Sequence, residues 1–183
     1  MTNLFEAAAE LMKSFVHGSG DKQPMHVGEV MHCWAYLASV GDANNYVKMG
    51  LNTTKDEDLR SILADSLKTC ESQRKRLTEV LLSEGVPLPP LSEMKPDCNP
   101  DDIPQGVKQT DNEIANGISI KVAISIVDCA TGIAQSIRPD VGLLWASFQE
   151  EHMKLAAAIR PLLSKRGWLK QPPFYVPPGS PVQ

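Results

Sequence analysis

The sequence has few aromatic residues, no long apolar run and no paired cysteines. Aromatic side chains make up 5% of the 183 residues. No apolar run approaches the roughly 20 residues that span a bilayer, so no membrane span is expected. Cys33, Cys70, Cys98 and Cys129 stand singly, without a Cys-x-x-Cys pair. This spacing fits neither a zinc knuckle nor a disulfide scaffold, and it indicates reduced thiols in a cytoplasmic protein.

Positive charge is also scarce. The chain has 18 Lys and Arg against 22 Asp and Glu, a net charge of −4, and the bases form no single stripe. We therefore expect no nucleic-acid partner. The first residues include Glu6 and lack the basic segment that opens a signal peptide. No Gly-rich phosphate loop and no Gly-x-Ser-x-Gly motif is present, so the sequence contains no recognisable motif for acyl or phosphoryl transfer.

Apolar residues recur at helical spacing in five segments, which predicts an all-α protein. The predicted helices are 3–16, 25–48, 54–84, 110–137 and 140–165. The first helix and the glycine break after it make residues 1–20 an N-terminal accessory segment. Residues 21–170 are predicted to form a four-helix bundle, and residues 171–183 a Pro-rich extended tail whose aromatic pair, Phe174 and Tyr175, pins it to the bundle.

Two capping boxes predict where helices begin. Thr54 with Glu57, and Thr110 with Glu113, have the spacing in which each side chain bonds the other residue's backbone. The second box matters most, because residues 118–126 alternate between apolar and polar as a strand does. The cap, and the absence of turn residues before Pro139, favour a helix there.

Residues 86–109 contain six prolines and predict an extended connection. A helix of nearly 30 residues is about 45 Å long, whereas this connection can reach roughly 70–80 Å. It can therefore run the full length of the bundle and leave helices 54–84 and 110–137 parallel. One long crossover is the ferritin-like topology. The predicted fold is a ferritin-like up-down four-helix bundle with one long crossover.

Glu29 and His32 form a Glu-x-x-His pair, which places a carboxylate and an imidazole about 5–6 Å apart on one helix face. Two such pairs and two further Glu build the di-metal site of ferritin-like bundles, but the sequence has no second pair. Asp128 lies mid-helix in an apolar stretch, and Glu151 and His152 lie near the inner face of the last helix. These five residues are the candidate ligands of a degenerate site for iron, manganese or zinc.

The same residues also permit a structural interpretation without any cofactor. Buried polar groups are commonly satisfied by neighbouring side chains. Gln73 or Arg74 is predicted at mid-bundle height, and an arginine there would oppose a bound cation. It favours a buried ionic network with carboxylates drawn from Glu29, Asp128 and Glu151. A third interpretation is a carrier with an apolar ligand pocket near Trp34, Trp145 and Phe148.

Several short motifs make residues 22–178 similar to a known family. They are Glu29 followed by Trp34, the charged stretch Ser72–Lys75, the exit Gly85-Val-Pro-Leu-Pro, and the end Arg166-Gly-Trp-Leu-Lys-Gln-Pro-Pro-Phe-Tyr-Val-Pro-Pro. The chain resembles the ferritin-like bundles of unknown function in spore-forming Bacillus-type bacteria, which are related to spore coat protein F. The resemblance implies the fold and a sporulation context, and it brings no catalytic residues. Family members often carry a His close to the position of Lys75, so the lysine weakens a metal site.

Taken together, these features predict a non-enzymatic structural or interaction protein, cytoplasmic and associated with the spore. The helices predicted over 25–48 and 110–137 carry few charges and leave apolar surface that a second subunit can cover. A homodimer is therefore predicted, with other spore-associated proteins as further partners. The alternative is a metal-binding, oxidase-like bundle.

Overall fold

The computed structural model describes residues 10, 13, 23–175 and 177–178 of the chain. Its helices are α2 (Val27–Thr53), α3 (Glu57–Ser83), α4 (Asp111–Gln135) and α5 (Pro139–Lys165), with a short 3-10 turn, η1 (Pro100–Asp102). These described residues contain no strand, so the all-α prediction is confirmed and residues 118–126 are helical. The accessory helix predicted over 3–16 lies outside the described residues, apart from Glu10 and Lys13.

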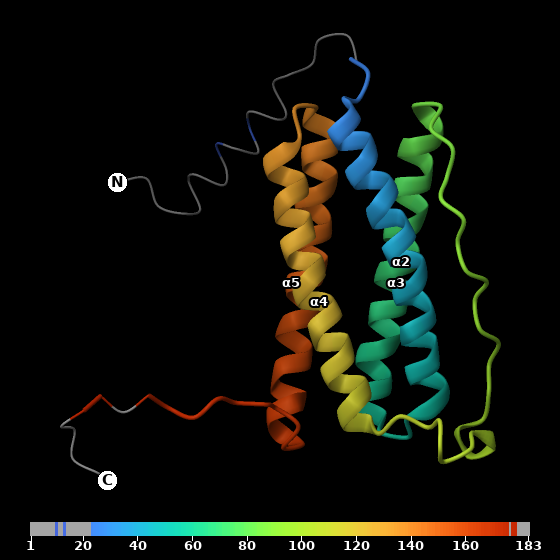
Figure 1. Ribbon diagram of the computed structural model, residues 1–183, viewed down its shortest axis with the longest axis vertical. Coiled ribbons are helices and arrows are strands. Elements are labelled where there is room, and N and C mark those ends of the chain that lie inside the picture. The colour runs from blue at the N-terminus through green and yellow to red at the C-terminus, as the bar shows by residue number, and fades with distance from the viewer. Residues whose placement is uncertain (1–9, 11–12, 14–22, 176, 179–183) are drawn as a thin grey trace.

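The four helices form two antiparallel hairpins, α2–α3 and α4–α5 (Figure 1). Between the hairpins, α2 packs on α4 and α3 packs on α5. The segment from α3 to α4 returns along the whole bundle before α4 begins, so α3 and α4 point in the same direction. The prediction of one long crossover is therefore confirmed, while the ferritin-like classification stays a prediction.

Two asparagines of α2 fix the course of this crossover. Asn45 and Asn52 each donate one hydrogen bond to its backbone and accept one from it. Their partners, at 2.8 to 3.3 Å, are Glu93, Lys95, Pro96 and Cys98. A side-chain amide offers both a donor and an acceptor. Each asparagine therefore pairs with the extended segment much as a neighbouring strand would.

The start of α3 differs from its prediction. Thr54 is the C-terminal cap of α2, and Asp56 caps α3 by accepting from the backbone N–H of Leu59 at 3.0 Å. The Thr54 hydroxyl instead accepts from Asp56 N at 3.1 Å. The predicted Thr54–Glu57 box is wrong because α2 continues to Thr53 and takes up Thr54 as its own end. The Thr110 box is confirmed in both of its hydrogen bonds.

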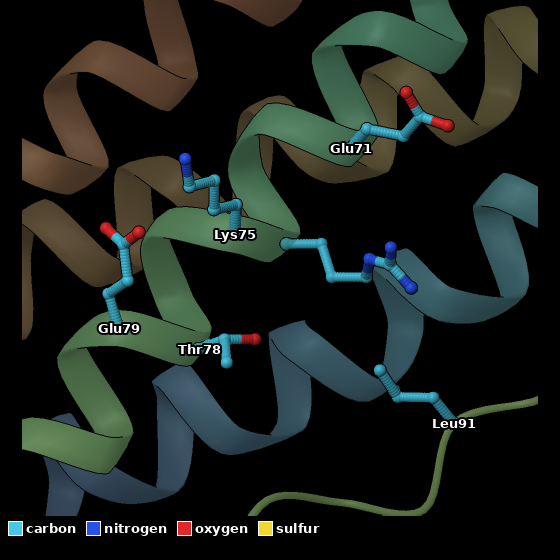
Figure 2. A pocket seen from close by; sticks show the side chains of 6 residues that line it. Glu71, Lys75, Thr78, Glu79 and Leu91 are labelled. Carbon is cyan, nitrogen blue, oxygen red and sulfur yellow. The ribbon is translucent and has the colours of Figure 1, made fainter.

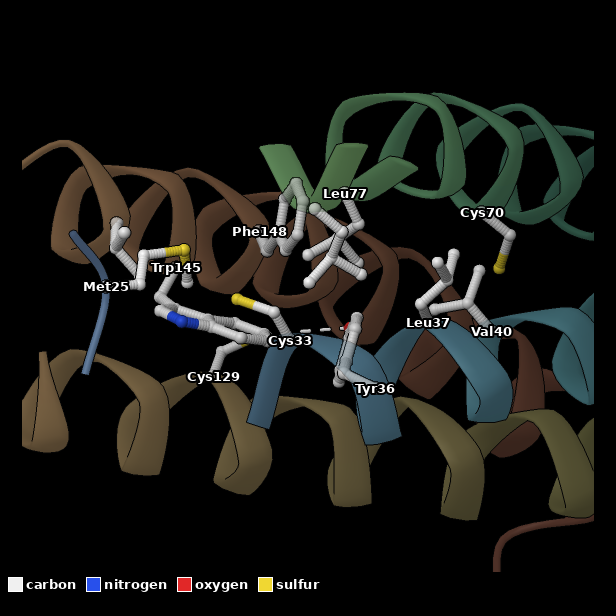
Figure 3. Packing of buried hydrophobic residues seen from close by; sticks show 12 residues of the cluster. Met25, Cys33, Tyr36, Leu37, Val40, Cys70, Leu77, Cys129, Trp145 and Phe148 are labelled. Atoms are coloured by element: carbon white, nitrogen blue, oxygen red, sulfur yellow. Dashed lines mark hydrogen bonds between the residues drawn. The ribbon is translucent and has the colours of Figure 1, made fainter. Parts of the chain in front are cut away.

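The apolar core is divided into two clusters along the bundle axis. One contains Trp145 and Phe148 of α5 (Figure 3), and the other contains Leu155 and Ile159 of the same helix. His152 lies between these pairs in the sequence and is also buried, at 4% exposure. A polar layer therefore separates the two apolar clusters.

The close approach of α4 to α5 depends on a glycine. A Cβ atom at Gly132 would lie 2.4 Å from Cδ2 of the Trp145 ring, which is far inside van der Waals contact. Trp145 is 1% exposed and is fixed by its aromatic neighbours, Tyr36 and Phe148. Gly132 thus provides the space in which the indole lies against the α4 backbone.

The C-terminal tail does not pack as predicted. Phe174 and Tyr175 are each 83% exposed, so they do not pin the tail to the bundle. The chain leaves α5 through Gly167, which has a φ of 69°, a left-handed conformation that favours glycine. From there the described part of the tail runs away from the bundle (Figure 1).

Candidate functional site

Glu29 is buried near the start of α2 and accepts three backbone hydrogen bonds. Its Oε1 accepts from Ile137 N at 2.9 Å and Arg138 N at 2.8 Å, and its Oε2 accepts from His26 N at 3.1 Å. The first turn of α2 is thereby joined to the turn between α4 and α5. This is the structural role that the sequence left open for Glu29.

His26 completes this junction as the N-cap of α2. Its Nδ1 accepts from Gly28 N at 3.0 Å, so the proton is on Nε2, which donates to the carbonyl of Gln135 at 3.2 Å. With Glu29 reaching back to its backbone, His26 forms a capping box in which imidazole replaces the usual hydroxyl. The sequence contains this pair, but histidine is an unusual N-cap and gives little signal.

Arg138 brings a positive charge to the same end of the bundle. Its guanidinium forms a two-pronged contact with Asp140, at 2.7 Å for each bond, and donates to Glu84 at 2.6 Å. The hydrogen bonds to Asp140 raise the pKa of Arg138, although its burial opposes this. The side chain therefore links the end of α3 to the start of α5. No sequence motif marks Arg138 for this role.

His32 and Asp128 meet, but through a backbone group. His32 Nε2 lies 3.0 Å from the carbonyl oxygen of Asp128, and the imidazole packs edge-on against Trp145 with centroids 4.6 Å apart. The carboxylate of Asp128 takes no part in this contact. His32 thus ties the first part of α2 to the last third of α4.

Five side chains from three helices form what we call the central polar cluster: Tyr36, Gln73, Arg76, Glu151 and His152. Tyr36 Oη lies 2.7 Å from His152 Nε2 and 3.1 Å from Gln73 Oε1. Gln73 Nε2 donates to Glu151 at 2.8 Å, and Arg76 donates to the other oxygen of that carboxylate at 2.5 Å. The cluster runs from the buried centre, at Tyr36, to the half-buried pair of Arg76 and Glu151.

Glu151 sets the direction of these hydrogen bonds. Its carboxylate only accepts, so Gln73 turns its amide nitrogen toward it and its oxygen toward Tyr36 and His152. Burial lowers the pKa of His152 to about 4, although Glu151 opposes this shift. The imidazole is therefore neutral at neutral pH, and its Nδ1 has no partner among the described residues.

The arginine of this cluster is not the one predicted. Arg74 is exposed, whereas Arg76 reaches Glu151 and lies over the Phe148 ring at 4.4 Å. Gln73 is fully buried on the inner face of α3. Arg76 follows it by three positions and therefore lies at the edge of the same face, whereas Arg74 points outward. Of the three carboxylates considered for this network, Glu151 is the one that pairs with an arginine, and that arginine is Arg76 instead of Arg74.

Three cysteines line the core beside the cluster. Burial raises the pKa of Cys33 and Cys129 to about 12 and that of Cys70 to about 11. The Cys129 thiol donates to Tyr36 Oη at 3.9 Å (Figure 3). The reactive thiolate is therefore disfavoured at all three positions. With Cys98, all four cysteines are free.

The five predicted metal ligands do not converge. Glu151 and His152 belong to the central polar cluster, Glu29 lies at the end of the bundle, and His32 contacts the backbone at Asp128. Within the described part of the chain, no group of three or more His, Cys, Asp and Glu side chains is placed to hold a metal ion.

A surface pocket of about 580 Å³ opens along α3 (Figure 2). Its lining is Glu71, Arg74, Lys75, Thr78 and Glu79, with Leu91 of the crossover. Two acids and two bases line it, so their formal charges cancel. It is separate from the aromatic region predicted for a carrier, where Trp145 packs edge-to-face on Phe148 and Trp34 donates to Pro87.

One helix presents apolar side chains to solvent. We call the exposed residues Ile120, Ala123, Ile124, Val127, Ala130 and Ala134 the α4 outer face. Ile120, Ile124 and Val127 are 56–64% exposed. Among the described residues, α4 is also the one helix long and apolar enough to cross a membrane, with a mean hydropathy of 1.6 and 22% of that stretch buried. Core helices of soluble proteins meet the same criterion, so this is weak evidence for a span.

Comparison with known proteins identifies relatives along almost the whole chain. A family model described as "Protein of unknown function (DUF3231)" matches residues 14–180. The uncharacterized protein YvdQ of Bacillus subtilis (strain 168) is 31% identical over 159 residues, which are 87% of this chain and 94% of YvdQ.

Solved structures agree with this relationship. The crystal structure of a candidate spore coat protein of Bacillus halodurans C-125 is similar with a TM-score of 0.81 and 35% identity, over 84% of this chain and 97% of that one. A DUF305 fragment of Deinococcus radiodurans has a TM-score of 0.62 at 13% identity, over 78% and 99%, and shares the fold alone. The resemblance to bundles of unknown function from Bacillus-type bacteria is thus confirmed. The chain belongs to the DUF3231 family of proteins of unknown function.

Proposed function

We propose that this protein is a non-enzymatic structural or interaction protein that acts as a homodimer and associates with the spore. One contrast carries the proposal. Glu29 and the side chains of the central polar cluster are engaged by hydrogen bonds within the fold, whereas the uncharged α4 outer face is open to solvent. The surface of the chain is therefore better suited to binding a protein partner than its interior is to binding a substrate.

The burial of the polar side chains in the interior supports a non-enzymatic role. Tyr36, Gln73 and His152 are each at most 4% exposed, and Glu151 is engaged by two donors. A group that performs acid–base chemistry must reach the proton that it transfers. The central polar cluster instead connects α2, α3 and α5, and such buried networks can fix one packing arrangement of a core.

The relatives support the cellular context. The similar structure from Bacillus halodurans is that of a candidate spore coat protein, and YvdQ comes from another Bacillus species. Four free cysteines suit a reducing compartment. We place the protein in the cytoplasm, from which it becomes associated with the spore and with other spore proteins.

Spore fractionation tests this function. Antibodies against the chain are applied to washed spores of the organism that encodes it, with an abundant cytosolic enzyme as control. We expect the chain to remain in the spore fraction and to be released only by extraction that solubilises coat proteins. Recovery with the cytosolic enzyme in the first washes would contradict the proposal.

A second candidate function is a degenerate, oxidase-like metal site. The observation that favours it is the buried Nδ1 of His152, which has no partner among the described residues; His152 directly follows Glu151 in the sequence. Elemental analysis of untagged protein distinguishes the two functions, with Glu29→Ala and His152→Gln as variants. Near-stoichiometric iron, manganese or zinc that is lost in either variant would support the metal site. Traces that stay unchanged would support the structural role.

A further inference from the structure

The α4 outer face has the spacing of a coiled-coil seam. Ile120, Ala123, Val127, Ala130 and Ala134 follow one another at intervals of three, four, three and four residues. This is the heptad pattern by which one helix packs on another. All five are exposed, so the seam has no partner helix among the described residues.

The seam is free of formal charge. The nearest charged residues, Lys121 and Asp128, belong to the side of α4 that faces α2. Lys121 lies over the Tyr46 ring at 4.9 Å, and the backbone of Asp128 contacts His32. Two copies can therefore bring this face together without opposing like charges, which would cost several kcal/mol.

The pattern of large and small residues is complementary to itself. We infer that α4 packs antiparallel on α4 of a second copy, about a two-fold axis near residue 125. In this register Ile120 faces Ala130 of the second copy, and Val127 faces Ala123 of the second copy. Each branched side chain meets a methyl group, which allows close packing. A parallel pair would instead set Ile120 on Ile120 and Ala123 on Ala123, so that crowded and empty layers alternate.

The available area suits a dimer. α4 has 25 residues, and a strip about 38 Å long and about 10 Å wide is too small alone. α2 packs beside α4 and adds the exposed Val27 and Met31. The α4 strip supplies about half of the roughly 800 Å² per partner of a typical stable interface, and the start of α2 extends it.

A lipid surface fits this face less well than a second copy does. Helices that lie on membranes carry Lys and Arg beside their apolar stripe. The two bases within α2 and α4 are Lys48 and Lys121. Lys48 pairs with Asp97 of the crossover, and Lys121 is placed over Tyr46. Neither is placed to hold an anionic headgroup.

This inference rests on the homodimer of the proposed function and specifies its surface and register. The test uses two single variants of the full chain, Ala123→Lys and Val127→Glu. Light scattering at micromolar concentration should give twice the 20.0 kDa of one chain for the wild type. Each variant should give the mass of a monomer, because the new charge is buried against an apolar residue. An equimolar mixture of the two should restore the dimer, because the introduced lysine of one copy then faces the introduced glutamate of the other.

A matched mixture checks the register. Ala123→Lys with Ile120→Glu carries the same charges, but in the proposed register those two positions do not face each other, so it should stay monomeric. Circular dichroism checks that each variant keeps its helices. The inference is overturned by a monomeric wild type, by variants that remain dimeric, or by equal recovery in both mixtures. A monomeric wild type that floats with phosphatidylglycerol vesicles would point to a membrane instead. Retention in the spore fraction is measured independently of the oligomeric state. A failed dimer test would therefore leave the proposed association with spores open to its own test.

Discussion

At the residue scale, Glu29 shows how one carboxylate can join two chain segments that are distant in sequence. It satisfies an N–H at the start of α2 and two N–H groups in the α4–α5 turn, more than 100 residues away in sequence. Unpaired buried N–H groups cost free energy comparable to a lost hydrogen bond. A charged acceptor shared among three of them therefore stabilises a junction that no regular secondary structure could form.

His152 makes the stability of the fold depend on pH. Its pKa is about 4 in the folded chain, against 6.5 when unperturbed, so the unfolded chain binds more protons between these values. The free energy of unfolding should be highest above pH 6.5. It should fall toward pH 4, by up to about 1.4 kcal/mol per pH unit. Urea denaturation between pH 7.5 and 4 measures this slope.

The His152→Gln variant is the control for that prediction. An amide keeps a donor and an acceptor toward Tyr36 and Gln73 but does not titrate. Its unfolding free energy should therefore change less over the same range than that of the wild type. Equal slopes in the two proteins would show that other groups are responsible.

The sequence identified some polar residues of the interior, among them Glu29, Gln73 and His152, but not their roles. Glu29 and His32 match half of a metal motif, and His152 was correctly placed on the inner face of its helix. Their actual partners include backbone groups of Ile137, Arg138 and Asp128. A backbone N–H or C=O has the same chemistry at every residue, so no sequence pattern reveals which one a side chain will meet.

At the element scale, the end of α2 was predicted too early, at residue 48 instead of Thr53. The segment contains Asn44, Asn45, Gly50 and Asn52, all of which favour turns or helix ends. In the fold the last three of these residues have tertiary roles. Asn45 and Asn52 bond the crossover, and Gly50 admits Leu63 and Ile114, which a Cβ would approach within 3.0 Å. Tertiary contacts thus override the local propensity.

Gly132→Ala should separate α4 from α5. The added methyl would meet the buried Trp145 ring at 2.4 Å, and overpacking of this kind costs about 1–3 kcal/mol. Alanine favours a helix over glycine by about 0.5–1 kcal/mol, which offsets part of the loss. We expect a net destabilisation of roughly 1–2 kcal/mol by denaturant unfolding, with weaker near-ultraviolet circular dichroism from Trp145.

Gly106→Ala provides the comparison. A Cβ at Gly106 would have no atom within 4 Å. Its stability should stay within about 0.5 kcal/mol of the wild type, as is usual for surface changes. A Gly132→Ala protein as stable as Gly106→Ala would mean that Trp145 is not fixed against α4.

At the scale of the whole molecule, a dimer joined through α4 would show a concentration-dependent melting temperature. Association that favours the folded state stabilises it by mass action. The midpoint of thermal unfolding should therefore rise with wild-type concentration and stay constant for Ala123→Lys. Scanning calorimetry over a hundredfold dilution measures this. A constant midpoint for both proteins would argue against coupling between folding and association.

The topology of the molecule was largely predictable. Six prolines in residues 86–109 ruled out a long α-helix there, and the reach of that segment exceeded the length of the helices beside it. The attachment of the crossover to α2 was not predictable, because asparagines within a helix usually signal its end rather than a contact.

The pinned crossover has a consequence for how the molecule assembles. Each hairpin joins helices that are neighbours in sequence, whereas the contacts between hairpins connect distant segments. Once Asn45 and Asn52 hold the crossover, α4 starts at a fixed place beside the first hairpin. The second hairpin is then presented to the first at a high effective concentration. Cutting the chain within the crossover would turn this docking into a bimolecular reaction, and the yield of complete bundles would depend on the concentration of the two halves.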